Sequence, residues 1–118
     1  MKIERISALT LKVRDMCAAV QFYRDVLGLE IIFGGEGASF SSLCLGDEEG
    51  TILNLEEGYP VNGWGRVIFY VDDVDACWEY LKEKGFEPER PQDAAWGERY
   101  FHMLDTDGHE LSFARPLG

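Results

Sequence analysis

The first half of the chain alternates apolar and polar residues in short stretches on either side of one helical stretch. Strands are expected over residues 5–13, 29–33, 40–45 and 51–56. From Met16 to Leu27, apolar residues recur at helical spacing, which is typical of an amphipathic helix. Asp15 is suited to cap the start of this helix and Gly28 to end it. With a turn over residues 46–50, the predicted order is β-α-β-β-β.

The second half of the chain repeats this pattern after a glycine-rich linker over residues 58–65. Strands are expected over residues 66–71, 86–89, 98–104 and 109–114, with a loop over residues 90–97. Asp72 or Asp73 is suited to cap a helix that continues to Lys84, and Gly85 ends it. The predicted order is again β-α-β-β-β.

The two halves correspond by number as well as by pattern. Ala8 and Arg66, in the first strand of each half, lie 58 positions apart. Leu53 and Leu111, in the last strand of each half, are also 58 positions apart. Such a constant spacing indicates an internal repeat of one structural unit.

One β-α-β-β-β unit cannot bury both faces of its strands, so two copies are expected to pack together. We predict an α+β fold of two tandem modules that form a curled mixed sheet, with the helices outside and a cup inside. A single domain is expected over residues 1–118, with modules at about 1–57 and 66–118 joined by the linker.

The charge of the chain is strongly negative, with 22 acidic and 11 basic side chains and a net charge of −11. Such a field repels nucleic acid and attracts cations, and it also serves solubility. No apolar stretch approaches membrane-spanning length, and the first residues lack a signal-peptide core. Neither nucleic acid nor a membrane is therefore expected as a partner.

The three cysteines, Cys17, Cys44 and Cys77, are odd in number and unclustered. This pattern favours reduced thiols in a cytoplasmic protein over a disulfide framework or a zinc site.

Several short motifs resemble one known family. Residues 11–15 (LKVRD) and 22–29 (FYRDVLGL) are similar to the opening of the glyoxalase/bleomycin-resistance/dioxygenase family, also called the vicinal oxygen chelate superfamily. Residues 69–75 (FYVDDVD), followed by 85–86 (GF), resemble the opening of its second module. Residues 105–109 (DTDGH) resemble its closing turn. The resemblance implies paired β-α-β-β-β modules, a homodimer, and a ligand or metal in the cup.

The resemblance also implies where the family's metal enzymes hold their ion. Histidine, glutamate or glutamine ligands are implied at the positions of Ala8, Asn54, Arg66 and Ser112. None of these residues is a histidine or a carboxylate, and Arg66 brings a fixed positive charge. We therefore expect no metal, no cofactor and no catalytic residue here.

Candidate ligand-binding residues are those that alternation places on the inner face, together with two tryptophans in loops. They are Asn54, Glu56, Arg66, Tyr70, His102, Glu110, Ser112, Trp64 and Trp96. The two tryptophans are candidates for stacking on a flat or cationic ligand, and equally for loop anchoring or dimer packing.

Three residues on the expected inner face, Arg66, His102 and Cys44, leave alternatives open. Arg66 is expected either to pair with Glu56 or Glu110 or to contact a ligand anion. His102 is a candidate general base or a hydrogen-bonded residue of the pocket wall. Cys44 lies 58 positions before His102 and is either a nucleophile beside it or a small buried thiol.

These features favour a binding protein that holds a small organic molecule, an antibiotic or a metabolite, of cationic or aromatic character, without a metal. Whether the chain is an enzyme stays open. The alternative is a metal-dependent enzyme like lactoylglutathione lyase or a dioxygenase, with an atypical site made by Glu56, His102 and Glu110. A regulatory or assembly role without a ligand is a third hypothesis. The sequence does not decide whether one chain or a swapped dimer forms the cup.

Overall fold

A computed structural model describes residues 1–45 and 50–118, which form two compact units over residues 1–61 and 62–118. The boundary between the units falls inside the expected linker. The turn expected over residues 46–50 lies, apart from Gly50, outside the described residues.

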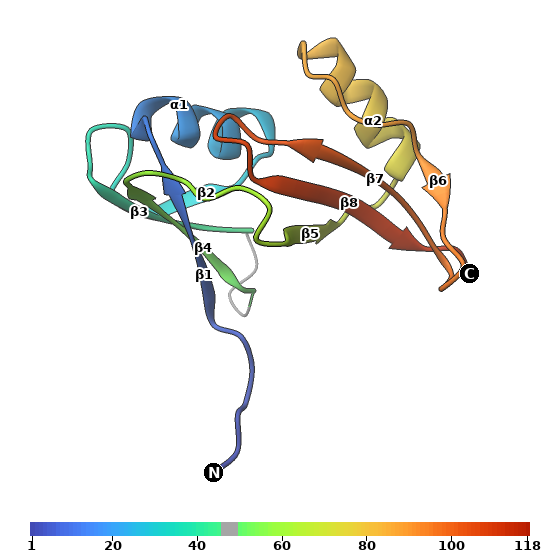
Figure 1. The fold of residues 1–118 in the computed structure, drawn as a ribbon, viewed down its shortest axis with the longest axis horizontal. Coiled ribbons are helices and arrows are strands. Elements are labelled where there is room, and N and C mark those ends of the chain that lie inside the picture. Colours follow the sequence, from blue (N-terminus) through green and yellow to red (C-terminus); the bar gives the residue numbers. More distant parts are fainter. Residues whose placement is uncertain (46–49) are drawn as a thin grey trace. The chain divides into compact units, whose positions relative to one another are not determined.

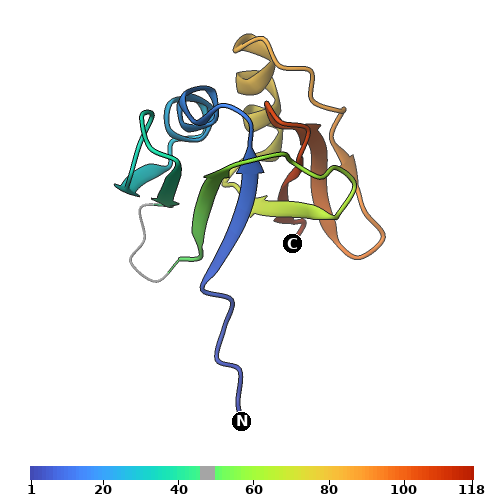
Figure 2. The same cartoon turned by 60° about the vertical axis from the view of Figure 1, so that its left-hand side comes forward.

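The first unit is a four-stranded sheet in the order β1-β4-β3-β2, with β1 parallel to β4 and the other neighbours antiparallel. Its elements are β1 (Ala8–Val13), α1 (Met16–Val20), η1 (Gln21–Val26), β2 (Glu30–Phe33), β3 (Phe40–Cys44) and β4 (Ile52–Glu57). Figure 1 and Figure 2 both show β1 beside β4, with residues 1–7 leading away from the sheet. The first strand thus begins at Ala8, later than expected.

The second unit repeats this arrangement, with β5 parallel to β8 and the strand order β5-β8-β7-β6. Its elements are β5 (Arg66–Tyr70), α2 (Val74–Glu83), β6 (Gln92–Asp93), β7 (Glu98–Leu104) and β8 (Glu110–Pro116). The predicted α+β fold of two β-α-β-β-β modules is confirmed. In the described residues, no helix has the length and apolar character needed to cross a membrane.

Both helices start at the predicted aspartates. The Asp15 carboxylate accepts a hydrogen bond from the Ala18 amide at 3.3 Å, and Asp73 accepts one from the Ala76 amide at 3.0 Å. Asp73 is therefore the cap of α2, because its side chain, and not that of Asp72, satisfies an unpaired amide of the first turn.

The helix predicted from Met16 to Leu27 changes type at Gln21 and continues as a π-helix. In this wider turn the Leu27 amide donates to the carbonyl of Phe22 at 3.0 Å. Phe22 and Tyr23 are both buried, with their rings edge to face at 5.0 Å. The π-helical segment thus contributes two adjacent aromatic side chains to the core.

The strand predicted over residues 86–89 is wrong, because the pairing strand β6 lies further on, inside the predicted loop. Pro88 has no amide proton for a strand ladder, and its carbonyl accepts a hydrogen bond from the Trp78 indole at 3.3 Å. One ladder-like bond remains in this segment, from the Glu89 amide to the His102 carbonyl at 2.9 Å.

Helix packing gives each sheet one covered face. Helix α1 packs against β4, and α2 packs against β7 and β8. The residues of the covered faces are apolar and buried: Leu11, Val13, Leu43, Leu53 and Leu55 in the first unit, and Val67, Phe101, Met103, Leu111 and Phe113 in the second. Leu45, the last residue of the strand expected over residues 40–45, follows the end of β3 and is exposed. The opposite faces carry the polar residues.

Candidate functional site

The face of the second sheet that α2 does not cover carries most of the candidate residues, and we call it the polar face. Alternate residues of β5, β7 and β8 share this face, because neighbouring strands keep them in register. They are Arg66, Ile68, Tyr70, Glu98, Tyr100, His102, Glu110, Ser112 and Ala114.

At one end of the polar face, Arg66 pairs with a carboxylate and a histidine. Its Nε and Nη2 atoms donate to Glu110 Oε2 at 3.3 and 3.1 Å. Its Nη1 atom lies 3.1 Å from His102 Nε2. Of the two expected carboxylate partners, Glu110 is the one that Arg66 contacts. The Arg66 side chain remains 42% exposed, so a bound molecule can still reach its guanidinium.

Arg66 determines which nitrogen of His102 carries the proton. A guanidinium is always protonated and only donates hydrogen bonds, so His102 Nε2 must accept. The proton of the neutral imidazole then lies on Nδ1, which faces the Ser112 hydroxyl at 2.5 Å. The pKa of His102 is lowered, first by burial and then by the positive charge of Arg66, which also favours the neutral ring.

This tautomer decides what the His102–Ser112 pair can do. Nδ1 donates its proton to Ser112 Oγ, so His102 cannot at the same time take a proton from that hydroxyl. A serine nucleophile activated by this histidine is therefore not formed. Ser112 is only 3% exposed, which adds to the evidence that the pair forms part of the wall of the polar face.

The lowered pKa of His102 predicts how stability depends on pH. The unfolded chain takes up a proton near pH 6.5, the unperturbed histidine value, before the folded chain does. The free energy of unfolding should therefore fall as pH drops from about 6.5 through the lower folded pKa. In His102→Asn this part of the loss should disappear, while an amide donor to Ser112 is kept. Urea unfolding of both proteins from pH 8 to 5 measures it, and equal pH slopes would contradict the assignment.

At the other end of the polar face, three aromatic residues surround Glu98. The Tyr70 hydroxyl donates to Glu98 Oε2, and the Trp96 indole donates to Oε1 at 2.9 Å. Trp96 stacks on Tyr100 at 5.6 Å between ring centroids. We call Tyr70, Trp96, Glu98 and Tyr100 the aromatic group. Sequence reasoning missed Glu98 as a site residue, although its parity matches that of Tyr100 and His102 in the same strand.

Trp64, the other loop tryptophan, is anchored at the closing turn. Its indole donates to His109 Nδ1 at 3.0 Å, and the His109 side chain is buried. The Asp105 carboxylate, in turn, accepts from the amides of Asp107 and His109, each at 2.9 Å. Of the alternatives for the two tryptophans, these contacts favour loop anchoring for Trp64.

The uncovered face of the first sheet has its own polar contacts. Asn54 accepts a hydrogen bond from Ser42 at 2.6 Å and donates one to Thr10 at 3.3 Å. Glu56 pairs with Lys12 of the neighbouring strand β1.

The strand registers correct one equivalence drawn from the repeat. Ser42 lies opposite Asn54, as His102 lies opposite Ser112, so Ser42 and not Cys44 is the counterpart of His102. The spacing is 60 here instead of 58, because the connection from β3 to β4 is two residues longer than that from β7 to β8. The proposed Cys44–His102 equivalence is therefore wrong.

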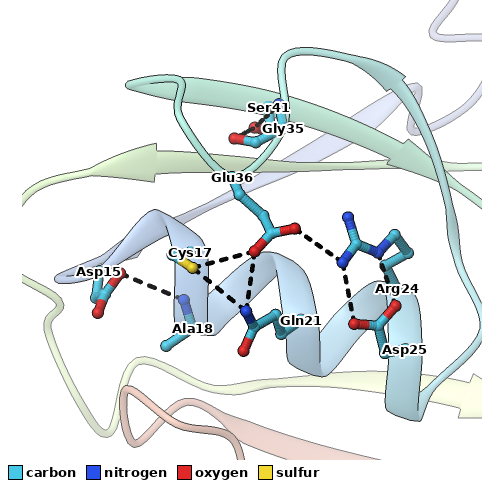
Figure 3. A network of polar contacts seen from close by, with 9 residues as sticks. All are labelled: Asp15, Cys17, Ala18, Gln21, Arg24, Asp25, Gly35, Glu36 and Ser41. Atoms are coloured by element: carbon cyan, nitrogen blue, oxygen red, sulfur yellow. Dashed lines mark hydrogen bonds and ion pairs between the residues drawn. The ribbon is translucent and has the colours of Figure 1, made fainter.

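A second polar network ties α1 and η1 to the loop after β2 (Figure 3). The Glu36 carboxylate accepts from the Cys17 thiol at 3.1 Å, from Gln21 at 2.9 Å and from Arg24 at 3.0 Å. The hydrogen bond to Glu36 raises the pKa of Cys17, and burial adds to the rise. The thiol therefore stays protonated at neutral pH and lacks the thiolate that a nucleophile needs.

The four positions where the family resemblance implies metal ligands do not suit a cation. Ala8 has no side-chain donor atom, and Asn54 is engaged with Ser42 and Thr10. Arg66 is positively charged, and Ser112 is already bonded to His102. In residues 1–45 and 50–118, no three His, Cys, Asp or Glu side chains are placed to share a metal ion.

The chain is thus a protein of two paired β-α-β-β-β modules, each with one sheet face covered by a helix and one polar face. The family model of the Glyoxalase/Bleomycin resistance protein/Dioxygenase superfamily matches residues 5–113, so the chain belongs to this superfamily.

Two curated relatives and one solved structure illustrate the breadth of the superfamily. Metallothiol transferase FosB of Staphylococcus epidermidis is 27% identical over 94% of this chain and 81% of its own. A probable lactoylglutathione lyase of Vibrio cholerae is 27% identical over 72% of this chain and 70% of its own. The fold is similar to that of TnmS3, an antibiotic binding protein from Streptomyces sp. CB03234, with a TM-score of 0.84 and 24% identity over 98% of each chain.

Proposed function

We propose that this chain is a cytoplasmic, homodimeric protein that binds a small organic molecule, an antibiotic or a metabolite, on its polar face without a metal ion. The observation that carries the proposal is the state of Arg66. It stands where a metal ligand is implied, and it is held by Glu110 and His102 while part of its guanidinium stays accessible. The antibiotic binding of TnmS3, a protein of the same fold, supports this choice.

The candidate residues take different parts in this proposal. Arg66, Glu110, His102 and Ser112 form the polar end that orients hydrogen-bonding groups of the ligand. Tyr70 and Trp96 offer aromatic surface. Asn54 and Glu56, on the first sheet, and Trp64, at the closing turn, remain candidates for contacts with the ligand.

A metal-dependent enzyme is the second candidate, and the similarity to a probable lactoylglutathione lyase favours it. It would need a metal site at Glu56, His102 and Glu110. His102 would have to release Arg66 to offer Nε2 to an ion, and Glu110 would have to give up its ion pair. These competing contacts make the binding protein the better-supported proposal.

A ligand panel tests the proposed function. Neutral aromatic, anionic and cationic compounds, including aromatic antibiotics, are titrated into chelator-treated protein while amide and indole signals are followed by NMR. We expect at least one compound to shift the signals of residues on the polar face, and Arg66→Gln to weaken its binding. If no compound of a broad panel shifts these signals, the proposal is wrong.

A further inference from the structure

The Glu98 carboxylate accepts hydrogen bonds from two side chains but takes part in no ion pair with a described residue. Ion pairs join Lys12, Arg24, Arg66 and Arg99 to other acidic residues, and none of these pairs includes Glu98. Its contacts come instead from two neutral aromatic donors, the Tyr70 hydroxyl and the Trp96 indole. Its negative charge is therefore hydrogen-bonded but not neutralised by a cationic side chain.

The strand register explains how these aromatic side chains come together. Tyr70 lies in β5 and Glu98 in β7, with β8 between them. Ala114 of β8 lies opposite both Tyr70 and Tyr100, so its small side chain lets the Tyr70 hydroxyl reach over β8 to Glu98. A larger residue at this position would obstruct that contact.

Trp96 leaves a large aromatic surface open beside the carboxylate. One face of its ring stacks on Tyr100, while the side chain as a whole remains 70% exposed. The exposed tryptophan is thus held in one orientation by the stack and by its bond to Glu98. An ordered, exposed indole beside an unneutralised carboxylate attracts a cation through both its π-face and the nearby charge.

The charge states support this arrangement. The hydrogen bonds that Tyr70 and Trp96 donate lower the pKa of Glu98. The hydrogen bond between Tyr70 and Glu98 also raises the pKa of Tyr70. At neutral pH the carboxylate is ionised and the phenol keeps its proton. The overall charge of −11 also favours the approach of a positively charged molecule.

We propose that the aromatic group is a subsite for an organic cation, namely an alkylated ammonium group of the ligand, with Glu98 as its counter-charge. This inference rests on the proposed function, since the subsite belongs to the same polar face. An alkylated ammonium needs few or no hydrogen bonds, which suits a carboxylate whose two oxygens already accept bonds from Tyr70 and Trp96. It would lie against the open face of Trp96.

The test compares two small probes of nearly the same shape. Choline carries a trimethylammonium group, and 3,3-dimethylbutan-1-ol replaces it with a neutral tert-butyl group. We expect choline to shift the indole N–H signal of Trp96 in a saturable manner and the neutral alcohol to shift it little. The indole signal of Trp78, which bonds to Pro88 on the helix side, should stay unchanged.

Variants separate the roles of charge and ring. Glu98→Gln keeps the size and one acceptor oxygen but removes the charge, and it should weaken choline binding about tenfold or more. Glu79→Gln removes one charge from the exposed surface of α2 and should leave binding unchanged. Trp96→Leu alters an exposed position, so it should fold normally and also lose choline binding.

The outcomes distinguish this inference from the proposed function. If neutral or anionic compounds bind the polar face while choline and its alcohol analogue behave alike, the cation subsite is refuted and the proposed function stands. Equal choline affinity in Glu98→Gln and the parent protein also refutes the subsite. If neither probe nor any compound of the panel shifts the polar face, both proposals fail.

Discussion

Replacing Phe101 by alanine is expected to lower the free energy of unfolding by about 3–5 kcal/mol. Phe101 is 1% exposed and stacks on Phe113, with ring centroids 5.1 Å apart. Phe113 stacks in turn on Phe69 at 5.6 Å, so three rings form a row across β7, β8 and β5 under α2. Removing the end of this row leaves a cavity between the sheet and the helix, and both the lost burial and the cavity destabilise the fold.

Urea unfolding followed by far-ultraviolet circular dichroism measures this loss. Phe101→Leu is the matched control, because it keeps an apolar side chain and most of the volume, and its loss should be clearly smaller. A loss below about 1 kcal/mol for Phe101→Ala would contradict the packing described for this face.

Replacing Asp105 by alanine should cost about 2–4 kcal/mol, although this residue lies in a turn. Its carboxylate accepts hydrogen bonds from the amides of Asp107 and His109, and all three residues are buried. Without the carboxylate, two buried amide donors lose their partner, and each unsatisfied donor costs free energy. The turn also presents His109 to Trp64, so the effect should reach the tryptophan.

Asp105→Asn is the control, since its amide oxygen can still accept one or both of these bonds. We expect it to lose less stability than Asp105→Ala under the same denaturant conditions. Tryptophan fluorescence gives a second measurement, because the surroundings of Trp64 should change in the alanine variant only. Equal stabilities of the parent protein and Asp105→Ala would show that the turn does not depend on this carboxylate.

The fold could be predicted largely from local signals. The constant spacing of 58 between Ala8 and Arg66 reflects a real structural repeat, because the first and last strands of each unit pair in the same parallel register. The capping aspartates Asp15 and Asp73 were visible because a cap depends on the few residues next to it.

The parts of the fold that were predicted wrongly depend on which of several possible hydrogen bonds a backbone group forms. Residues 86–89 were expected to form a strand from their position in the repeat. Pro88, however, has no amide proton for strand pairing, and its carbonyl accepts a hydrogen bond from the Trp78 indole. The pairing then begins at Gln92. The π-helix that starts at Gln21 was not predicted either, because periodicity alone does not show which carbonyl accepts the hydrogen bond of each amide.

The candidate site could be predicted as a face but not as a set of contacts. Alternation identified which side chains share the polar face, since parity along a strand is a local property. It could not choose between Glu56 and Glu110 as the partner of Arg66, because that choice depends on strand order. The parity of Glu98 along its strand would have placed it on this face, but its contact with Tyr70, across an intervening strand, was not predictable.

The most direct measurement of metal-free ligand binding is calorimetric titration of the tightest compound found in the ligand panel. The titration is carried out on chelator-treated protein and again after adding Zn²⁺, Ni²⁺ or Mn²⁺. Because Ala8, Asn54, Arg66 and Ser112 do not suit a metal ion, the dissociation constant should be the same in every case. Binding that appears only together with one equivalent of bound metal would contradict the proposed function and favour the metal-dependent enzyme.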